Sequence, residues 1–115
     1  MTPVTVAPAA RRDVRDILRW SDSQFGRQAR DRYRRFIERA CVDLRSDPAR
    51  PGVQRHQDMA ADHFLYHLRH GRSLSPADRV ASPRHFLAFR HRGDHIEIVR
   101  ILHDAMNLPS HLNRG

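Results

Sequence analysis

The first hydrophobic pattern along the chain is a short alternation that gives way to helical spacing. Val4 and Val6 flank Thr5 just before Pro8, and alternation with a period of two is typical of a β-strand. From residue 9 the period changes to that of one helix face, i, i+4, i+7, i+8. The residues at these positions are Ala10, Val14, Ile17 and Leu18. The pattern predicts an opening strand and then an amphipathic helix of about three turns that ends near residues 21–23.

A second apolar stripe predicts a helix from about Gln24 to Leu44. The stripe consists of Ala29, Tyr33, Phe36, Ile37, Ala40, Cys41 and Leu44. Asp22 or Ser23 stands where a side chain caps the first free amides of a helix. Because the joint between the two helices is so short, we expect them to be antiparallel. Prolines and a glycine in residues 46–52 stop the second helix, and a loop through Gln57 follows.

Three strand-like runs make up most of the remaining sequence, at residues 64–69, 85–91 and 96–102. They are rich in aromatic and β-branched side chains, and residues 92–94 have the length of a hairpin connection between the last two. Residues 71–83 are polar with two prolines, which predicts a flexible surface loop. The last strand is aliphatic on both faces, so we expect it to be central. Because the helices cover one face only, part of the cover on the other face is expected from another molecule.

The predicted fold is α+β, with an N-terminal strand, an antiparallel helical hairpin and then a three-strand antiparallel meander. The 115 residues suit a single domain spanning 1–115. No apolar run approaches the roughly 20 residues that span a bilayer, so we expect a cytoplasmic protein without a membrane partner. Cys41 stands alone in a helical stripe, which is typical of a buried thiol.

The formal net charge is +8, and all of the basic residues are arginine. Such a charge favours association with acidic proteins, nucleic acid or anionic surfaces. The arginines spread over both predicted helices, and no helix-turn-helix pattern appears, so sequence-specific DNA binding is not expected.

Three segments of the chain resemble the ParE branch of the RelE/ParE superfamily of bacterial toxins. They are AARRDVRDI at residues 9–17, Phe25-Gly26 followed by Ala29 and Tyr33, and IEIVRILH at residues 96–103, continuing to Met106 and His111-Leu112. The sequence departs from the ParE pattern in a longer 71–83 segment and in Asn107, where an aspartate is usual. The resemblance implies the toxin of a type II toxin-antitoxin module that inhibits growth by binding and poisoning DNA gyrase. It also implies neutralisation by a cognate antitoxin in a hetero-oligomer, without cofactors and without catalytic residues.

An acidic, partly disordered antitoxin segment is the expected partner of the outer face of the helical hairpin and the sheet edge, because such segments fold as they wrap a surface. The residues predicted to contact it are Trp20, Phe25, Tyr33 and Phe36. Tyr33 and Phe36 have an alternative role, which is to hold the helices against the sheet. Trp20 lies off the main stripe, which favours partner contact.

The alternative function is that of the RelE-like relatives, which cleave messenger RNA at the ribosome and need acid-base groups and cations around a phosphate. The residues available for such a set are His103, His111, Arg84, Arg90 and Arg100. His103 can instead close the last strand through a hydrogen bond to the tail. Arg100 can pair with a carboxylate such as Glu97 or Asp104, or contact a partner. A metal site is not expected, because the pairs His63/His67 and His67/His70 fall in a strand, where this spacing does not converge.

Overall fold

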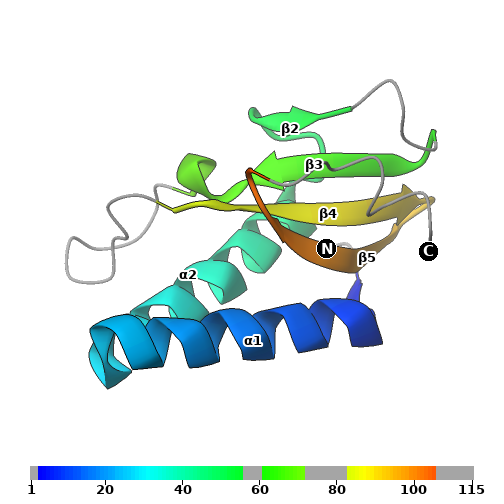
Figure 1. Ribbon diagram of the computed structural model, residues 1–115. Coiled ribbons are helices and arrows are strands. Elements are labelled where there is room, and N and C mark those ends of the chain that lie inside the picture. The colour runs from blue at the N-terminus through cyan, green and yellow to red at the C-terminus, as the bar shows by residue number, and fades with distance from the viewer. Residues whose placement is uncertain (1–2, 56–60, 72–82, 106–115) are drawn as a thin grey trace.

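The computed structural model describes residues 3–55, 61–71 and 83–105. Along the chain these form β1 (Val4–Val6), α1 (Pro8–Phe25), α2 (Arg27–Ser46), β2 (Val53–Gln54), β3 (His63–His67), the short 3-10 helix η1 (Leu68–His70), β4 (His85–Arg92) and β5 (His95–His103). The strands form one sheet in the order β1-β5-β4-β3-β2. Both long helices lie on one face of this sheet (Figure 1). The predicted α+β fold is therefore confirmed.

β5 occupies the inner position that its aliphatic pattern predicts. It pairs in parallel with β1 and antiparallel with β4, and the hairpin turn between β4 and β5 has Gly93 at a φ of +57°. The parallel pair joins the first and last strands of the chain, and α1, α2 and β2–β4 lie between them in sequence, which gives the long connection that parallel strands need. β2 was not predicted: Val53 and Gln54 pair antiparallel with Tyr66 and Leu65, inside a segment expected to be a loop.

The joint between the helices lies later in the chain than predicted. α1 begins with Pro8, whose fixed φ suits the first helical position, and continues for 18 residues to Phe25. Asp22 and Ser23 therefore lie in the last turns of α1, and their predicted role as caps of α2 is wrong. The chain reverses at Gly26, which has a φ of +91° and no side-chain cap. A side chain is strained at this φ, whereas glycine adopts it readily.

The main core lies between the helical hairpin and the sheet. Its buried members are Ala10, Phe36, Ile37, Ala40, Leu44, Tyr66, Leu68, Leu87, Phe89, Ile96, Ile98 and Ile101. Cys41 packs partly buried against this core, and burial raises the pKa of its thiol to about 11. A smaller cluster forms on the other face of the sheet, where Leu65 and Ala88 are buried beside Phe86 and Val99. The alternation of side chains along a strand separates the two clusters.

Some predictions fall outside the described residues. They concern most of the 71–83 segment, the departure at Asn107 and the tail that contains His111. Neither α1 nor α2, nor any other helix in the described ranges, has an apolar stretch of the length needed to cross a membrane.

Candidate functional site

Two aromatic side chains stand exposed at the end of α1, next to the joint with α2. Trp20 is 57% exposed and Phe25 is 68% exposed, and their rings meet edge to face with centroids 5.7 Å apart. We call this pair the aromatic tip. Among the described residues, the other large hydrophobic side chain that stays exposed is Val42 of α2. Among the described residues, the exposed large hydrophobic side chains thus lie on the helical hairpin, the element on which contact with the antitoxin was expected.

Tyr33 and Phe36, the other two predicted antitoxin contacts, point inward. Phe36 is 3% exposed and belongs to the main core, so its assignment to an outer surface is wrong for the chain as it stands. Tyr33 is partly buried and stacks on Phe36, with ring centroids 6.2 Å apart. Both side chains hold α2 against the sheet, which is the alternative role that the sequence allowed.

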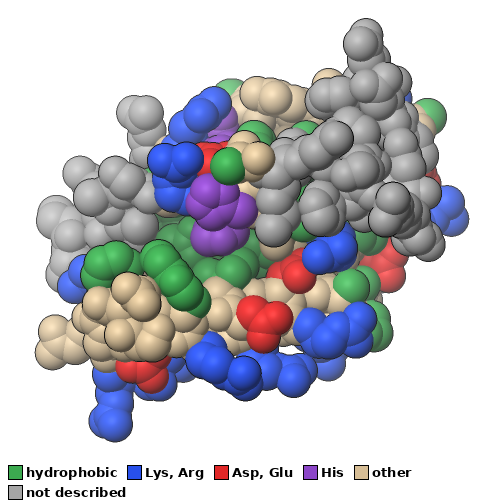
Figure 2. Space-filling model, viewed as in Figure 1, with side chains coloured by type: hydrophobic (Ala, Val, Ile, Leu, Met, Phe, Trp, Pro, Cys, Tyr) green, Lys and Arg blue, Asp and Glu red, His purple; other side chains and the backbone are tan. Residues whose placement is uncertain are grey.

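A group of polar side chains gathers where β4 begins and β5 ends. We call Tyr33, His67, Arg84, His85, His103 and Asp104 the polar cluster. The register of the sheet places His85 opposite His103, with ring centroids 5.4 Å apart. On the helix side, the Tyr33 hydroxyl lies 2.7 Å from Nδ1 of His85. Figure 2 shows histidine side chains in contact with acidic and basic neighbours on this face.

Asp104 is the centre of the polar cluster. Its carboxylate accepts hydrogen bonds from Nε of Arg84 at 3.1 Å and from Nε2 of His67 at 3.1 Å. His67 is the donor because its Nδ1 accepts a hydrogen bond from the amide of Arg69, 3.0 Å away, and a neutral imidazole has one N–H. The backbone amide of Asp104 also donates to the carbonyl of Arg84 at 2.8 Å. Asp104 therefore ties the ends of β3, β4 and β5 together.

Burial and neighbouring charges set the protonation of the polar cluster. Burial and, to a smaller extent, the proximity of His103 lower the pKa of His85 to about 4. Burial also raises the pKa of the Tyr33 hydroxyl, so at neutral pH Tyr33 and His85 are both uncharged and share the hydrogen bond between the hydroxyl and Nδ1. Burial alone would raise the pKa of Asp104, but hydrogen bonds from His67 and Arg84 outweigh it and the pKa lies below its usual value. A charged carboxylate thus neutralises Arg84.

The residues proposed for RNA cleavage do not all come together. Arg84 and His103 meet at Asp104, whereas Nη1 of Arg90 lies 3.5 Å from Glu97. His103 accepts a hydrogen bond at Nδ1 from the amide of Ala105, 3.1 Å away, so it closes the last strand as the alternative predicted.

Arg100 reaches neither of its expected partners. Its Nε lies 2.7 Å from Oδ2 of Asp13 on α1. Arg100 thus pairs with a carboxylate, as expected, but with one on α1 and not with Glu97 or Asp104.

The histidines of β3 and η1 have separate partners. His63 bonds to Asp62, His67 bonds to Asp104, and the ring of His70 lies against Tyr66. Within the three described ranges, no set of three or more metal-binding side chains is close enough to hold an ion.

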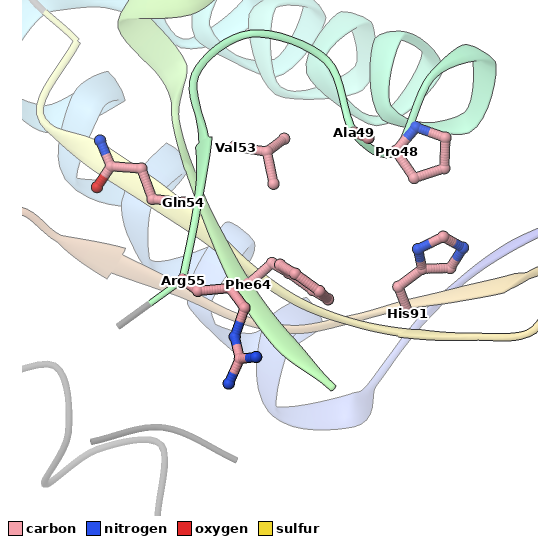
Figure 3. Close-up of a pocket in the computed structure, with 7 residues that line it drawn as sticks. All are labelled: Pro48, Ala49, Val53, Gln54, Arg55, Phe64 and His91. Carbon is pink, nitrogen blue, oxygen red and sulfur yellow. The ribbon is translucent and has the colours of Figure 1, made fainter. Parts of the chain in front are cut away.

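A shallow pocket beside β2 contains none of the predicted site residues (Figure 3). It is lined by Pro48, Ala49, Val53, Gln54, Arg55, Phe64 and His91. Val53 and Phe64 supply its apolar wall, and the guanidinium of Arg55 lies 6.0 Å from the centroid of the Phe64 ring. The lining has no carboxylate, and His91 is its one side chain able to act as a general acid or base.

The strand, helical hairpin and mostly antiparallel sheet define a RelE/ParE-like toxin fold. Residues 4–108 match the family described as ParE toxin of type II toxin-antitoxin system, parDE. The chain belongs to this family, and a cognate antitoxin is the partner that membership implies. No curated protein matches the sequence.

Proposed function

We propose that this toxin acts in the bacterial cytoplasm by protein-protein binding, inhibits DNA gyrase, and is neutralised when an acidic antitoxin segment covers the aromatic tip. The exposure of Trp20 and Phe25, at 57% and 68%, is the observation that supports antitoxin binding at the tip. Arg19 and Arg27 flank the pair in sequence and are also exposed. An apolar centre with a basic rim suits an acidic amphipathic segment.

The size of the aromatic tip suits a binding hot spot. Fully burying an aromatic side chain of this size contributes on the order of 1.5–3 kcal/mol, and more than half of the surface of each residue is still exposed. Trp is among the residues most enriched at hot spots. A disordered antitoxin segment gains this energy as it folds and thereby offsets its ordering cost.

Two observations support gyrase as the target: membership of the ParE family, and the pairing of the basic residues with carboxylates. In the described structure, Arg84 is held by Asp104, Arg90 by Glu97 and Arg100 by Asp13. An RNA-cleaving site needs cations free to meet a phosphate, and these three are engaged by carboxylates. A mode of action that needs no assembled catalytic group is therefore favoured.

The antitoxin proposal is tested with the acidic protein encoded beside the toxin gene. We expect the double variant Trp20→Ala/Phe25→Ala to weaken its binding by about 100-fold or more, which corresponds to about 2.7 kcal/mol. Val42→Ala is the matched control, because Val42 is also exposed and lies on α2 away from the tip. Calorimetry measures both affinities, and equal affinity for the double variant and the control would refute the assignment.

The gyrase proposal is tested by supercoiling assays with purified toxin. We expect inhibition of supercoiling and accumulation of cleaved DNA, while messenger RNA stays intact. Primer extension that shows codon-linked cuts after induction would instead support the RelE-like alternative. In that case Arg84→Ala, His103→Ala and His111→Ala should abolish the cuts.

A further inference from the structure

Three arginines form an exposed row along α1. Arg11, Arg15 and Arg19 are exposed and stand four residues apart, a spacing that places them on one side of a helix. Within the part of the chain that the structure describes, none of them makes an ion pair or a side-chain hydrogen bond. We call them the arginine row. Figure 2 shows basic side chains along the margin where Figure 1 places α1.

The carboxylates of α1 leave this row largely uncompensated. Asp13 pairs with Arg100, and Asp22 pairs with Arg30. Asp16 is the remaining acidic residue of α1 whose charge can offset the exposed arginines. Like charges four residues apart on a helix repel each other. An anionic partner that lies along α1 relieves this repulsion.

The absence of apolar side chains in the row indicates what kind of anion it suits. A polypeptide that folds on a surface needs apolar anchors. The large exposed hydrophobic residues of the described chain are Val42 and the aromatic tip, which begins next to Arg19 at the end of the row, so Arg11 and Arg15 have no such anchor beside them in sequence. A nucleic-acid backbone needs no such anchor, because release of counterions supplies most of its binding free energy. Arginine also matches phosphate oxygens with paired N–H donors.

The length of the row fits several phosphates. Eight residues of helix separate Arg11 from Arg19, which is about 12 Å at 1.5 Å per residue. Each strand of duplex DNA carries one charge per about 3.4 Å of the duplex axis, so the row faces about three to four phosphates of one strand. We propose that α1 lays the arginine row along the phosphate backbone of duplex DNA, without selecting a base sequence.

Fluorescence polarisation with a labelled 20-base-pair duplex of arbitrary sequence tests this proposal between 50 and 200 mM NaCl. The row variant Arg11→Gln/Arg15→Gln/Arg19→Gln is compared with a control that replaces Arg34, Arg55 and Arg69 by glutamine. Both variants lower the net charge of +8 by the same three charges. We expect the row variant to bind at least about 10-fold more weakly, with a salt slope shallower by about 2.7, whereas the control keeps a slope near that of the unchanged chain.

If both variants lost DNA affinity equally, the proposal would be overturned, because the loss would then depend on net charge and not on the position of the arginines. A row variant that keeps its DNA affinity but loses binding to an acidic helical peptide would also overturn it and would assign the row to a polypeptide. Circular dichroism checks the fold, and the single variant Arg15→Glu provides a second, milder perturbation. Neither gyrase nor antitoxin is present in the assay, so its result is independent of the proposed function.

Discussion

The link between Asp13 and Arg100 gives the sharpest prediction about stability. Oδ2 of Asp13 accepts hydrogen bonds from Nε of Arg100 at 2.7 Å and from the amide of Ile101 at 2.9 Å, and Oδ1 accepts from Nη2 of Arg100 at 3.1 Å. The two side chains are 16% and 31% exposed. The link joins α1 to β5 and also raises the pKa of Arg100.

We expect Asp13→Ala to lower the free energy of unfolding by about 3 kcal/mol. A hydrogen bond to a charged group contributes about 1.5–3 kcal/mol, and the substitution also leaves a partly buried guanidinium and the amide of Ile101 without their acceptor. Domains of this size have about 5–15 kcal/mol in total, so the melting temperature should fall by about 10 °C. Asp13→Asn keeps an acceptor for the amide and should lose less.

Urea denaturation followed by circular dichroism measures this loss, with the slope against urea as a check that unfolding stays two-state. Asp16→Ala is the control, because it removes the same charge from an exposed position of the same helix and should change stability by less than about 0.5 kcal/mol. A double-mutant cycle with Arg100→Met isolates the pair. A loss below about 1 kcal/mol for Asp13→Ala, or one equal to that of Asp16→Ala, would refute the reasoning.

Three further predictions concern pH, a glycine and the core. The pKa of His85 falls from 6.5 to about 4 on folding, so the unfolded chain binds the proton first as pH falls. The free energy of unfolding should therefore fall as the pH falls from 6.5 to about 4. His85→Gln should make this fall smaller in urea titrations, and an unchanged dependence on pH would contradict the prediction. A Cβ on Gly52, at a φ of +100°, would lie 2.6 Å from the ring of His70, whereas one on Gly26 would have no neighbour within 4 Å. Both substitutions carry backbone strain of about 1–3 kcal/mol, and only Gly52→Ala adds the clash with His70, so Gly52→Ala should lower the melting temperature more than Gly26→Ala; the reverse order would exclude the steric argument. Phe89→Ala, at a fully buried position, should cost about 3–5 kcal/mol in urea denaturation, and a change under 1 kcal/mol would place Phe89 outside the core.

The hydrophobic periods predicted the long elements well and the short ones poorly. β4 and β5 fall where aromatic and β-branched residues cluster, and α2 follows its apolar stripe. β2 has two residues, which is too short to show a period. The cap assigned to Asp22 or Ser23 failed because polar residues near a helix end are equally suited to its last turn, and the positive φ of Gly26 decided the boundary.

The candidate sites were predicted in part. Trp20 lies off the apolar stripe and is exposed as expected, whereas Phe36 lies on the stripe and is in the core. Position relative to the stripe was the useful signal, and it should have excluded Phe36. The roles of His67 and Asp104 in the polar cluster were missed, since 37 residues separate them in the chain.

From the sequence alone follow the order of the long elements, the inner place of β5 and the excess of positive charge. These depend on periodicity and composition, which are local or additive properties of the chain. The tertiary structure decided which carboxylate meets which cation, as in Asp13 with Arg100, 87 residues apart. Hydrophobic burial is non-directional, so it does not determine which charged side chains pair. A hydrogen bond acts within about 3 Å, so its partners are set by the strand register and the chain connections that bring them together.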